Sequence, residues 1–152
     1  MPNENLVLIV EDNEDDVFFL HRAFKKAEIV NPVQVVSTGH DAMAYLAGTD
    51  PYSNWEKFPL PSIVLLDLKL PDLTGFDVLK WIRKSPGLQN LRVSIISGAC
   101  FAKDIQLAYE LRANGFITKA ATSAHLFEIM RAFRLHWLES SRAPEVFRTP
   151  LA

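Results

Sequence analysis

Apolar runs of strand length alternate along this chain with stretches in which apolar residues recur at helical spacing. The apolar runs predict strands over residues 6–10, 33–37, 62–67, 92–97 and 115–118. The helical spacing predicts five helices over about 14–28, 39–47, 76–84, 103–113 and 123–140. Such alternation is typical of an α/β protein whose parallel sheet carries helices on both faces.

Polar side chains follow the apolar runs at the points where four of the predicted strands end. Asp67 closes the run Ile63 to Leu66, Glu11 and Asp12 follow the first strand, Ser97 closes the fourth, and Lys119 follows the fifth. A charge at a buried strand end is costly unless it has a partner. The carboxyl ends of parallel strands meet at one edge of the sheet, where ligands bind, so we expect these residues to converge there.

The predicted cluster has the chemistry of a metal site that handles phosphate. Three carboxylates at one edge repel each other, and Mg²⁺ suits them because it needs few protein ligands and keeps waters or phosphate oxygens. Lys119 would pair with phosphate or with Asp67. Asp67 would then act as a nucleophile toward a phosphoryl group, and Ser97 would donate to a phosphoryl oxygen. Each residue alone also has a structural explanation, such as helix capping by Glu11 and Asp12; their occurrence together at four strand ends favours the site.

Composition limits the other possibilities. A chain of 152 residues, 49% of them hydrophobic, has the size of one domain, which we place at residues 1–140, with a tail at 141–152 that contains two prolines and no period. The net charge of −2 gives no case for nucleic acid as a partner. No apolar run reaches the roughly 18 residues of a membrane span, and the N-terminus has no signal-peptide pattern, so we expect a cytoplasmic protein.

Other potential chemical features are weak. Cys100 is the only cysteine, so no internal disulfide is expected, and the four histidines show no metal-ligand spacing. Residues 48–61 form a loop with three prolines and three aromatic residues that is longer than the usual connection. We interpret it as a flap that packs over the sheet edge, with partner binding as the less favoured alternative.

Four groups of residues together resemble the CheY-like receiver domain of two-component response regulators. They are Val10-Glu11-Asp12-Asn13, Leu65-Leu66-Asp67 with the loop from Leu70 to Gly75, Ser97-Gly98, and Lys119. The resemblance covers about residues 5–140 and implies a flavodoxin-like, doubly wound five-stranded parallel sheet of order 2-1-3-4-5. The acidic start and the long loop before the third strand resemble single-domain regulators paired with bacterial phytochrome-type kinases.

The resemblance also implies a role for each residue of the site. Glu11 and Asp12 would bind Mg²⁺ together with Asp67 and the backbone carbonyl of Lys69. Asp67 would be the phosphoacceptor, Lys119 the phosphate-binding lysine, Ser97 the switch hydroxyl and Phe116 the aromatic switch.

Two positions depart from the family pattern. Ala120 follows Lys119 where the family has proline, often after a cis bond; a non-proline cis bond costs about 2.5–4 kcal/mol, which favours trans and leaves the direction of Lys119 open. Lys69 places a long cationic side chain near the site, where it would alter phosphate lifetime or solvent access.

The leading functional hypothesis is a phosphorylation switch rather than an enzyme. A sensor histidine kinase would phosphorylate Asp67, and the change would alter the face made by the fourth helix, fifth strand and fifth helix, which would bind a downstream protein or form a homodimer. Two alternatives remain: a pseudo-receiver that binds partners constitutively, and a Mg²⁺-dependent phosphatase of the dehalogenase type. The phosphatase requires an Asp-x-Asp nucleophile after the first strand, where this chain has Glu11-Asp12.

Overall fold

A single parallel sheet forms the centre of the molecule. The computed structural model describes residues 6–98, 101–119, 123–135 and 145–149. The strands are β1 (Val7–Val10), β2 (Val33–Val36), β3 (Ile63–Asp67), β4 (Arg92–Ser97) and β5 (Gly115–Thr118), all paired in parallel in the order β2-β1-β3-β4-β5. The predicted fold class and strand order are confirmed.

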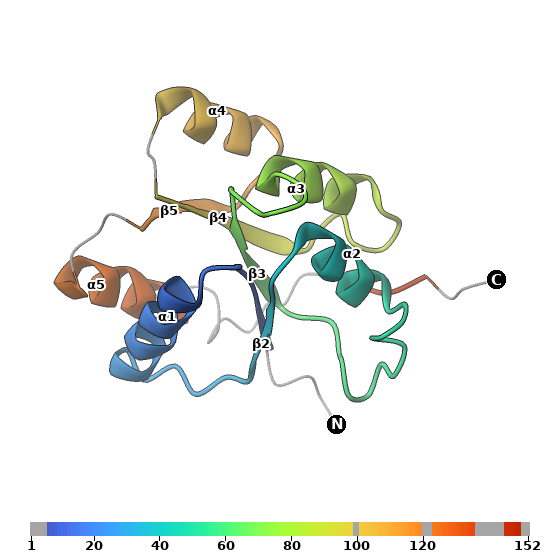
Figure 1. The fold of residues 1–152 in the computed structure, drawn as a ribbon, viewed down its shortest axis with the longest axis horizontal. Coiled ribbons are helices and arrows are strands. Elements are labelled where there is room, and N and C mark those ends of the chain that lie inside the picture. Colours follow the sequence, from blue (N-terminus) through green and yellow to red (C-terminus); the bar gives the residue numbers. More distant parts are fainter. Residues whose placement is uncertain (1–5, 99–100, 120–122, 136–144, 150–152) are drawn as a thin grey trace.

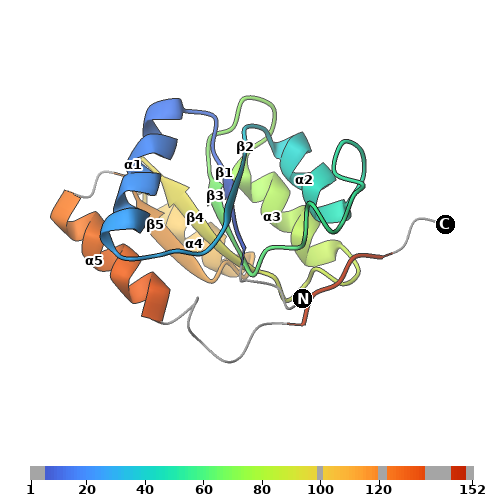
Figure 2. The ribbon, with the colours of Figure 1, turned by 90° about the horizontal axis from the view of Figure 1, so that it is seen from below.

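Five helices cover the two faces of the sheet (Figures 1 and 2). They are α1 (Glu14–Lys26), α2 (Gly39–Ala47), α3 (Gly75–Lys84), α4 (Ala102–Glu110) and α5 (Ser123–Phe133). One buried cluster joins the sheet to α1 and α5, and a second joins the opposite face to α2, α3 and α4. Strands β1 and β3 are buried along their whole length, which explains their uninterrupted apolar sequences.

Helix starts follow the sequence closely because side chains cap them locally. Asn13, Thr38 and Thr74 each accept a hydrogen bond from the backbone N–H three residues later, and Thr74 forms a full capping box with Asp77. These caps satisfy backbone donors that the first turn leaves without an intrahelical partner.

Two predicted helix ends are wrong by two or three residues. We expected α1 to reach residue 28 and α4 to reach 113, but they end at Lys26 and Glu110. In both cases a residue without the freedom of glycine takes a left-handed conformation just after the helix: Glu28 has φ 62° and Arg112 has φ 67°. The next N–H then bonds back to a carbonyl five residues earlier and closes the helix.

The remaining boundaries differ only slightly from expectation. The second strand ends at Val36 rather than Ser37, and the third begins at Ile63. Helix α5 is followed by a wider turn at residues 134–135, while its expected continuation to Ser140, with Trp137, lies outside the described residues. No helix in the described ranges is both long and apolar enough to cross a bilayer.

The 48–61 loop packs against the hydrophobic core, and the contacts described for it are with α2 rather than with the sheet edge over which we expected it to pack. Tyr52 and Phe58 contact each other and Tyr45 of α2, with ring centroids 5.1–5.9 Å apart. The Trp55 indole N–H donates to the carbonyl of Gly48 at 2.9 Å. The Tyr45 hydroxyl also donates to the Pro59 carbonyl at 2.9 Å, so aromatic packing and hydrogen bonds from side chains to main-chain carbonyls hold the loop on the end of α2.

Residues 145–149 belong to the segment expected to be a tail, yet they lie against the domain beside the end of α2 (Figure 1). Arg148 is buried and donates to the carbonyls of Tyr45 and Leu46 at 2.7 and 3.3 Å. The Phe147 N–H donates to the Gly87 carbonyl at 2.9 Å. One buried side chain and one main-chain N–H make these contacts. The sequence of this short segment has no helical or strand period that would have predicted them. The predicted boundary at residue 140 lies outside the described residues.

Candidate functional site

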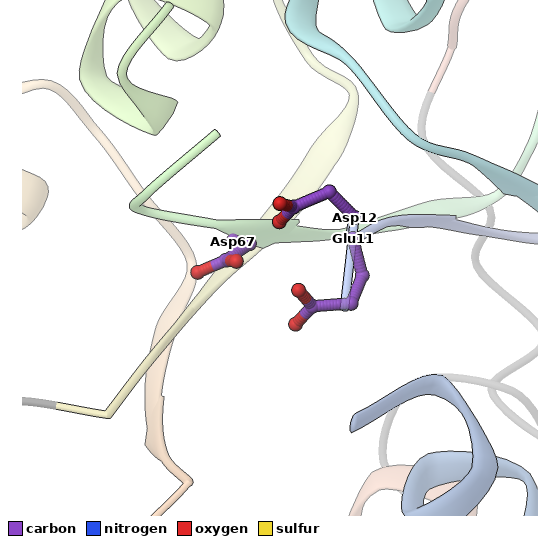
Figure 3. Close-up of side chains that lie close together, drawn as sticks. All are labelled: Glu11, Asp12 and Asp67. Carbon is purple, nitrogen blue, oxygen red and sulfur yellow. The ribbon is translucent and has the colours of Figure 1, made fainter. Parts of the chain in front are cut away.

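Three carboxylates come together where β1 and β3 end (Figure 3). Glu11, Asp12 and Asp67 each offer one oxygen, and these oxygens lie within 4.8 Å of one another. Glu11 and Asp67 are buried and Asp12 is exposed. The parallel pairing of β1 with β3, in which Val10 lies beside Leu66, brings the two strand ends to the same point. The predicted acidic cluster therefore forms.

Lys119 lies among these carboxylates. Its Nζ is 2.5 Å from Glu11 Oε1, 2.9 Å from Asp16 Oδ2 and 3.2 Å from Asp67 Oδ2. The side chain of Lys119 therefore points toward the acidic cluster, which answers the question raised by Ala120. The Lys119–Ala120 peptide bond lies outside the described residues. Asp16 was interpreted only as a favourable charge in the first turn of α1; no local pattern indicates its ion pair with a lysine 103 residues away.

The electrostatics of the site show an excess of negative charge. Burial first, and then the neighbouring Asp67, raise the pKa of Glu11 to about 7, although Lys119 and the N–H of Asn13 act in the opposite direction. Burial by itself lowers the pKa of Lys119, but hydrogen bonds to Glu11 and Asp16 and the charge of Asp67 outweigh it, so its pKa is raised. One lysine therefore does not neutralise the cluster, and Glu11 binds a proton readily.

The residues present fit a hard divalent cation. The donor set consists of carboxylate oxygens only, which Mg²⁺ and similar ions prefer. Glu11 Oε1 is buried, and the Lys119 ammonium lies beside it as an ion-pair partner. A divalent cation would give this oxygen a further positive partner and would reduce the repulsion between the carboxylates.

The other predicted site residues are placed as follows. Ser97 is buried at the end of β4, one residue beyond Ile96, the β4 partner of Asp67. Lys69 is exposed, and its N–H donates to Asp67 Oδ1 at 3.2 Å. Phe116 is half-buried in β5 and packs against the cluster under α2, α3 and α4, not among the carboxylates.

Asp72 supports the loop after β3 in a way that the sequence did not reveal. Its two carboxylate oxygens accept hydrogen bonds from the N–H groups of Gly39 and His40, at 2.8 and 2.9 Å, at the start of α2. Burial alone would raise the pKa of Asp72, but these bonds outweigh it and hold the pKa well below its usual range. The loop between Asp67 and α3 is therefore anchored to α2.

Gly75 lets the end of β3 and the start of α3 approach each other closely. A Cβ at this position would lie 2.5 Å from the carbonyl oxygen of Asp67, which is closer than real contacts allow. The Gly75 N–H donates to the Leu68 carbonyl at 2.8 Å. The turn glycine in the sequence is thus required by the backbone that positions Asp67.

Known proteins resemble this chain over most of its length. The family model described as the response regulator receiver domain matches residues 7–131. Response regulator Rcp1 of Synechocystis is 30% identical over 139 residues, which span 91% of this chain and 92% of Rcp1. The Mn²⁺-bound form of Rcp1 superposes with a TM-score of 0.80 and covers 92% of this chain and 99% of that one.

Two further solved structures are similar. One is the phosphorylated cyanobacterial phytochrome response regulator RcpA, which is 32% identical, has a TM-score of 0.83, and covers 93% of this chain and 99% of its own. The other is RPA3017, described as a response regulator in red light signalling of R. palustris, with 30% identity, a TM-score of 0.86 and the same coverage.

Proposed function

This chain belongs to the response regulator receiver domain family, and we propose that it accepts a phosphoryl group on Asp67 from a sensor histidine kinase, with Mg²⁺ bound beside it. The observation that carries this proposal is the surroundings of Asp67. Its carboxylate is buried at a strand end, 3.2 Å from Lys119 Nζ, with the carboxylates of Glu11 and Asp12 beside it.

The metal would be held by Glu11, Asp12, Asp67 and the backbone carbonyl of Lys69. When bound, Mg²⁺ supplies charge neutralisation for the transferring phosphoryl group and its equatorial oxygens. The bound form of Rcp1 contains Mn²⁺, another divalent cation, which supports a divalent site in the relative. Mg²⁺ is the proposed ion here because an oxygen-only set with few protein ligands suits it.

In the transfer step, a carboxylate oxygen of Asp67 forms a bond to phosphorus while the bond from phosphorus to the kinase histidine nitrogen breaks. The histidine nitrogen keeps the bonding electron pair, so the histidine returns to its neutral form after taking up its proton. The N–H of Lys69 holds Asp67 Oδ1, and Lys119 Nζ lies at Oδ2, so the carboxylate is oriented before the phosphoryl group arrives. Lys119 then pairs with the added negative charge.

Ser97 and Phe116 would pass the change on to a partner. In this proposal the Ser97 hydroxyl donates to a phosphoryl oxygen, and Phe116 turns inward from its half-buried position in β5. The face made by α4, β5 and α5 then changes shape. Phe101, just before α4, and Tyr109 within it are 60% and 51% exposed, and these give a downstream protein or a second copy an apolar surface to bind.

The relatives suggest the kind of kinase. RcpA is described as a phytochrome response regulator and was crystallised phosphorylated, and RPA3017 is described as acting in red light signalling. By this likeness we propose that the kinase is of the phytochrome type.

The test is the intact mass of the protein after incubation with acetyl phosphate and Mg²⁺, beside an Asp67→Asn variant and a sample treated with a chelator. We expect a gain of one phosphoryl group that requires the divalent ion and is absent in the variant. No gain under any condition would overturn the proposal in favour of a pseudo-receiver. Steady hydrolysis of a generic phosphoester would instead indicate a phosphatase.

A further inference from the structure

A cavity of about 320 Å³ lies between α1 and α5, next to the carboxylate cluster; Lys119 contacts the cluster and also lines the cavity. Figure 2 shows these two helices next to each other on one face of the sheet. Buried apolar residues from three elements form the inner wall: Leu20, Ala23, Ile96 and Ile117. Leu126 and Phe127 of α5 close the opposite side. The interior therefore suits an apolar group of the size of one or two rings.

The mouth of the cavity is basic. Arg22 and Lys26 lie one helical turn apart on α1, both line the cavity, and both are exposed. Within the described residues neither one forms an ion pair. The Lys26 Nζ lies 5.5 Å from the centre of the Phe127 ring, at the edge of the cavity.

The acidic group that lines the cavity does not neutralise these two cations. Asp16 is paired with Lys119, which also lines the cavity and contacts Glu11 and Asp67. The balance at the mouth is therefore two positive charges above an apolar interior. Among the described residues that line the cavity, a metal ion or an organic cation would find no carboxylate other than the paired Asp16, and inorganic phosphate would leave the apolar walls unfilled.

We propose that this cavity binds a small organic anion with an aromatic body. The ring would fill the space between Ala23, Ile117 and Phe127, and the carboxylate or sulfonate would lie between Arg22 and Lys26. The volume is at the lower end of the range for small-molecule sites, about 300–1,000 Å³, which limits the ligand to one or two rings. Guanidinium pairs carboxylate oxygens with two parallel hydrogen bonds, which explains why Arg22 would fix the orientation.

This site does not depend on the proposed phosphorylation. The cavity includes Asp16 and Lys119 but not Asp67, so an Asp67→Asn variant should bind the same ligand. Probe binding is measured on protein that is not phosphorylated, and phosphorylation is measured without the probe. Failure of one measurement can therefore be told apart from failure of the other.

The test uses naphthalene-2-carboxylate as the probe, titrated into the full-length ¹⁵N-labelled protein and followed by amide chemical shifts. We expect saturable shifts at Ala23, Ile117 and Phe127 and none at Ala42, which is buried under the other face of the sheet. The neutral probe naphthalene-2-carboxamide should bind at least tenfold more weakly, because it lacks the charge.

The matched variants are Arg22→Gln with Lys26→Gln, and Lys25→Gln as the control. All three positions are exposed on α1, so the variants should fold, and Lys25 does not line this cavity. The double variant should bind the acid at least tenfold more weakly, and the control should bind it like the wild type. Shifts that do not saturate, equal binding of the acid and the amide, or equal losses in the double variant and the control would overturn the proposal.

Discussion

Replacing Arg148 with methionine tests whether the C-terminal segment is an integral part of the fold. The guanidinium donates to the Tyr45 and Leu46 carbonyls in the last turn of α2 and lies 5.7 Å from the Tyr45 ring and 5.4 Å from the Trp55 ring. Methionine keeps much of the aliphatic contact but loses the charge, both hydrogen bonds and both ring interactions. The Leu46 carbonyl would lose this donor, and the Tyr45 carbonyl would keep the Gly48 N–H.

The magnitude follows from these losses. Hydrogen bonds from a charged donor contribute about 1.5–3 kcal/mol each, a cation at a helix C-terminus about 0.3–1, and each cation–π contact about 0.5–1. Burial of the guanidinium opposes this gain and is the reason that the pKa of Arg148 is lowered. We therefore expect the free energy of unfolding to fall by about 2–3 kcal/mol, well below the sum of the separate contributions.

The assay is urea unfolding followed by far-ultraviolet circular dichroism, with Arg131→Met as the control. Arg131 is exposed, and its nearest charge partner, Glu128, lies 3.8 Å away, so its loss should cost less than about 0.5 kcal/mol. The loss for Arg148→Lys should fall between the losses for Arg148→Met and Arg131→Met, because lysine keeps the charge but lacks the planar guanidinium that bonds both carbonyls. A value for Arg148→Met within 0.5 kcal/mol of the wild type would refute the reasoning and would mean that the segment is dispensable.

Three other perturbations have defined outcomes. Asp72→Ala removes both acceptors at the start of α2, so thermal unfolding should show a loss of about 1–2 kcal/mol; an unchanged midpoint would contradict the anchoring role. Arg112→Gly removes the strain of a left-handed backbone at a non-glycine residue and keeps the main-chain carbonyl to which Arg83 donates. The free energy of unfolding, measured with urea, should therefore rise by up to about 1 kcal/mol. A fall would show that the arginine side chain stabilises the turn. Without divalent ions, the free energy of unfolding of the wild type should fall relative to that of Glu11→Gln as the pH rises from about 4.5 to about 7. Its folded-state pKa lies above its unfolded value, so the folded state holds the extra proton in that window. A difference between wild type and variant that is flat with pH would contradict the raised pKa.

The sequence was informative wherever one local signal decided the structure. A polar residue directly after an apolar run predicted that Glu11, Asp67 and Lys119 meet at one edge of the sheet. This prediction was correct because parallel strands bring their carboxyl ends to the same edge. Helix starts were accurate because Asn13 and Thr74 cap them within one turn. The helix ends were less accurate, since left-handed conformations at Glu28 and Arg112 carry no glycine to mark them.

What the sequence by itself determined is the alternation of strands and helices, the topology that follows from it, and the acidic edge with its lysine. Tertiary structure decided which distant groups pair. Asp16 pairs with Lys119, Arg148 caps the end of α2, and buried Arg83 donates to the carbonyls of Leu91 and Arg112. The physical reason is that periodicity and capping depend on neighbours within a few residues, whereas a buried charge takes whichever partner the packed chain brings within hydrogen-bond distance.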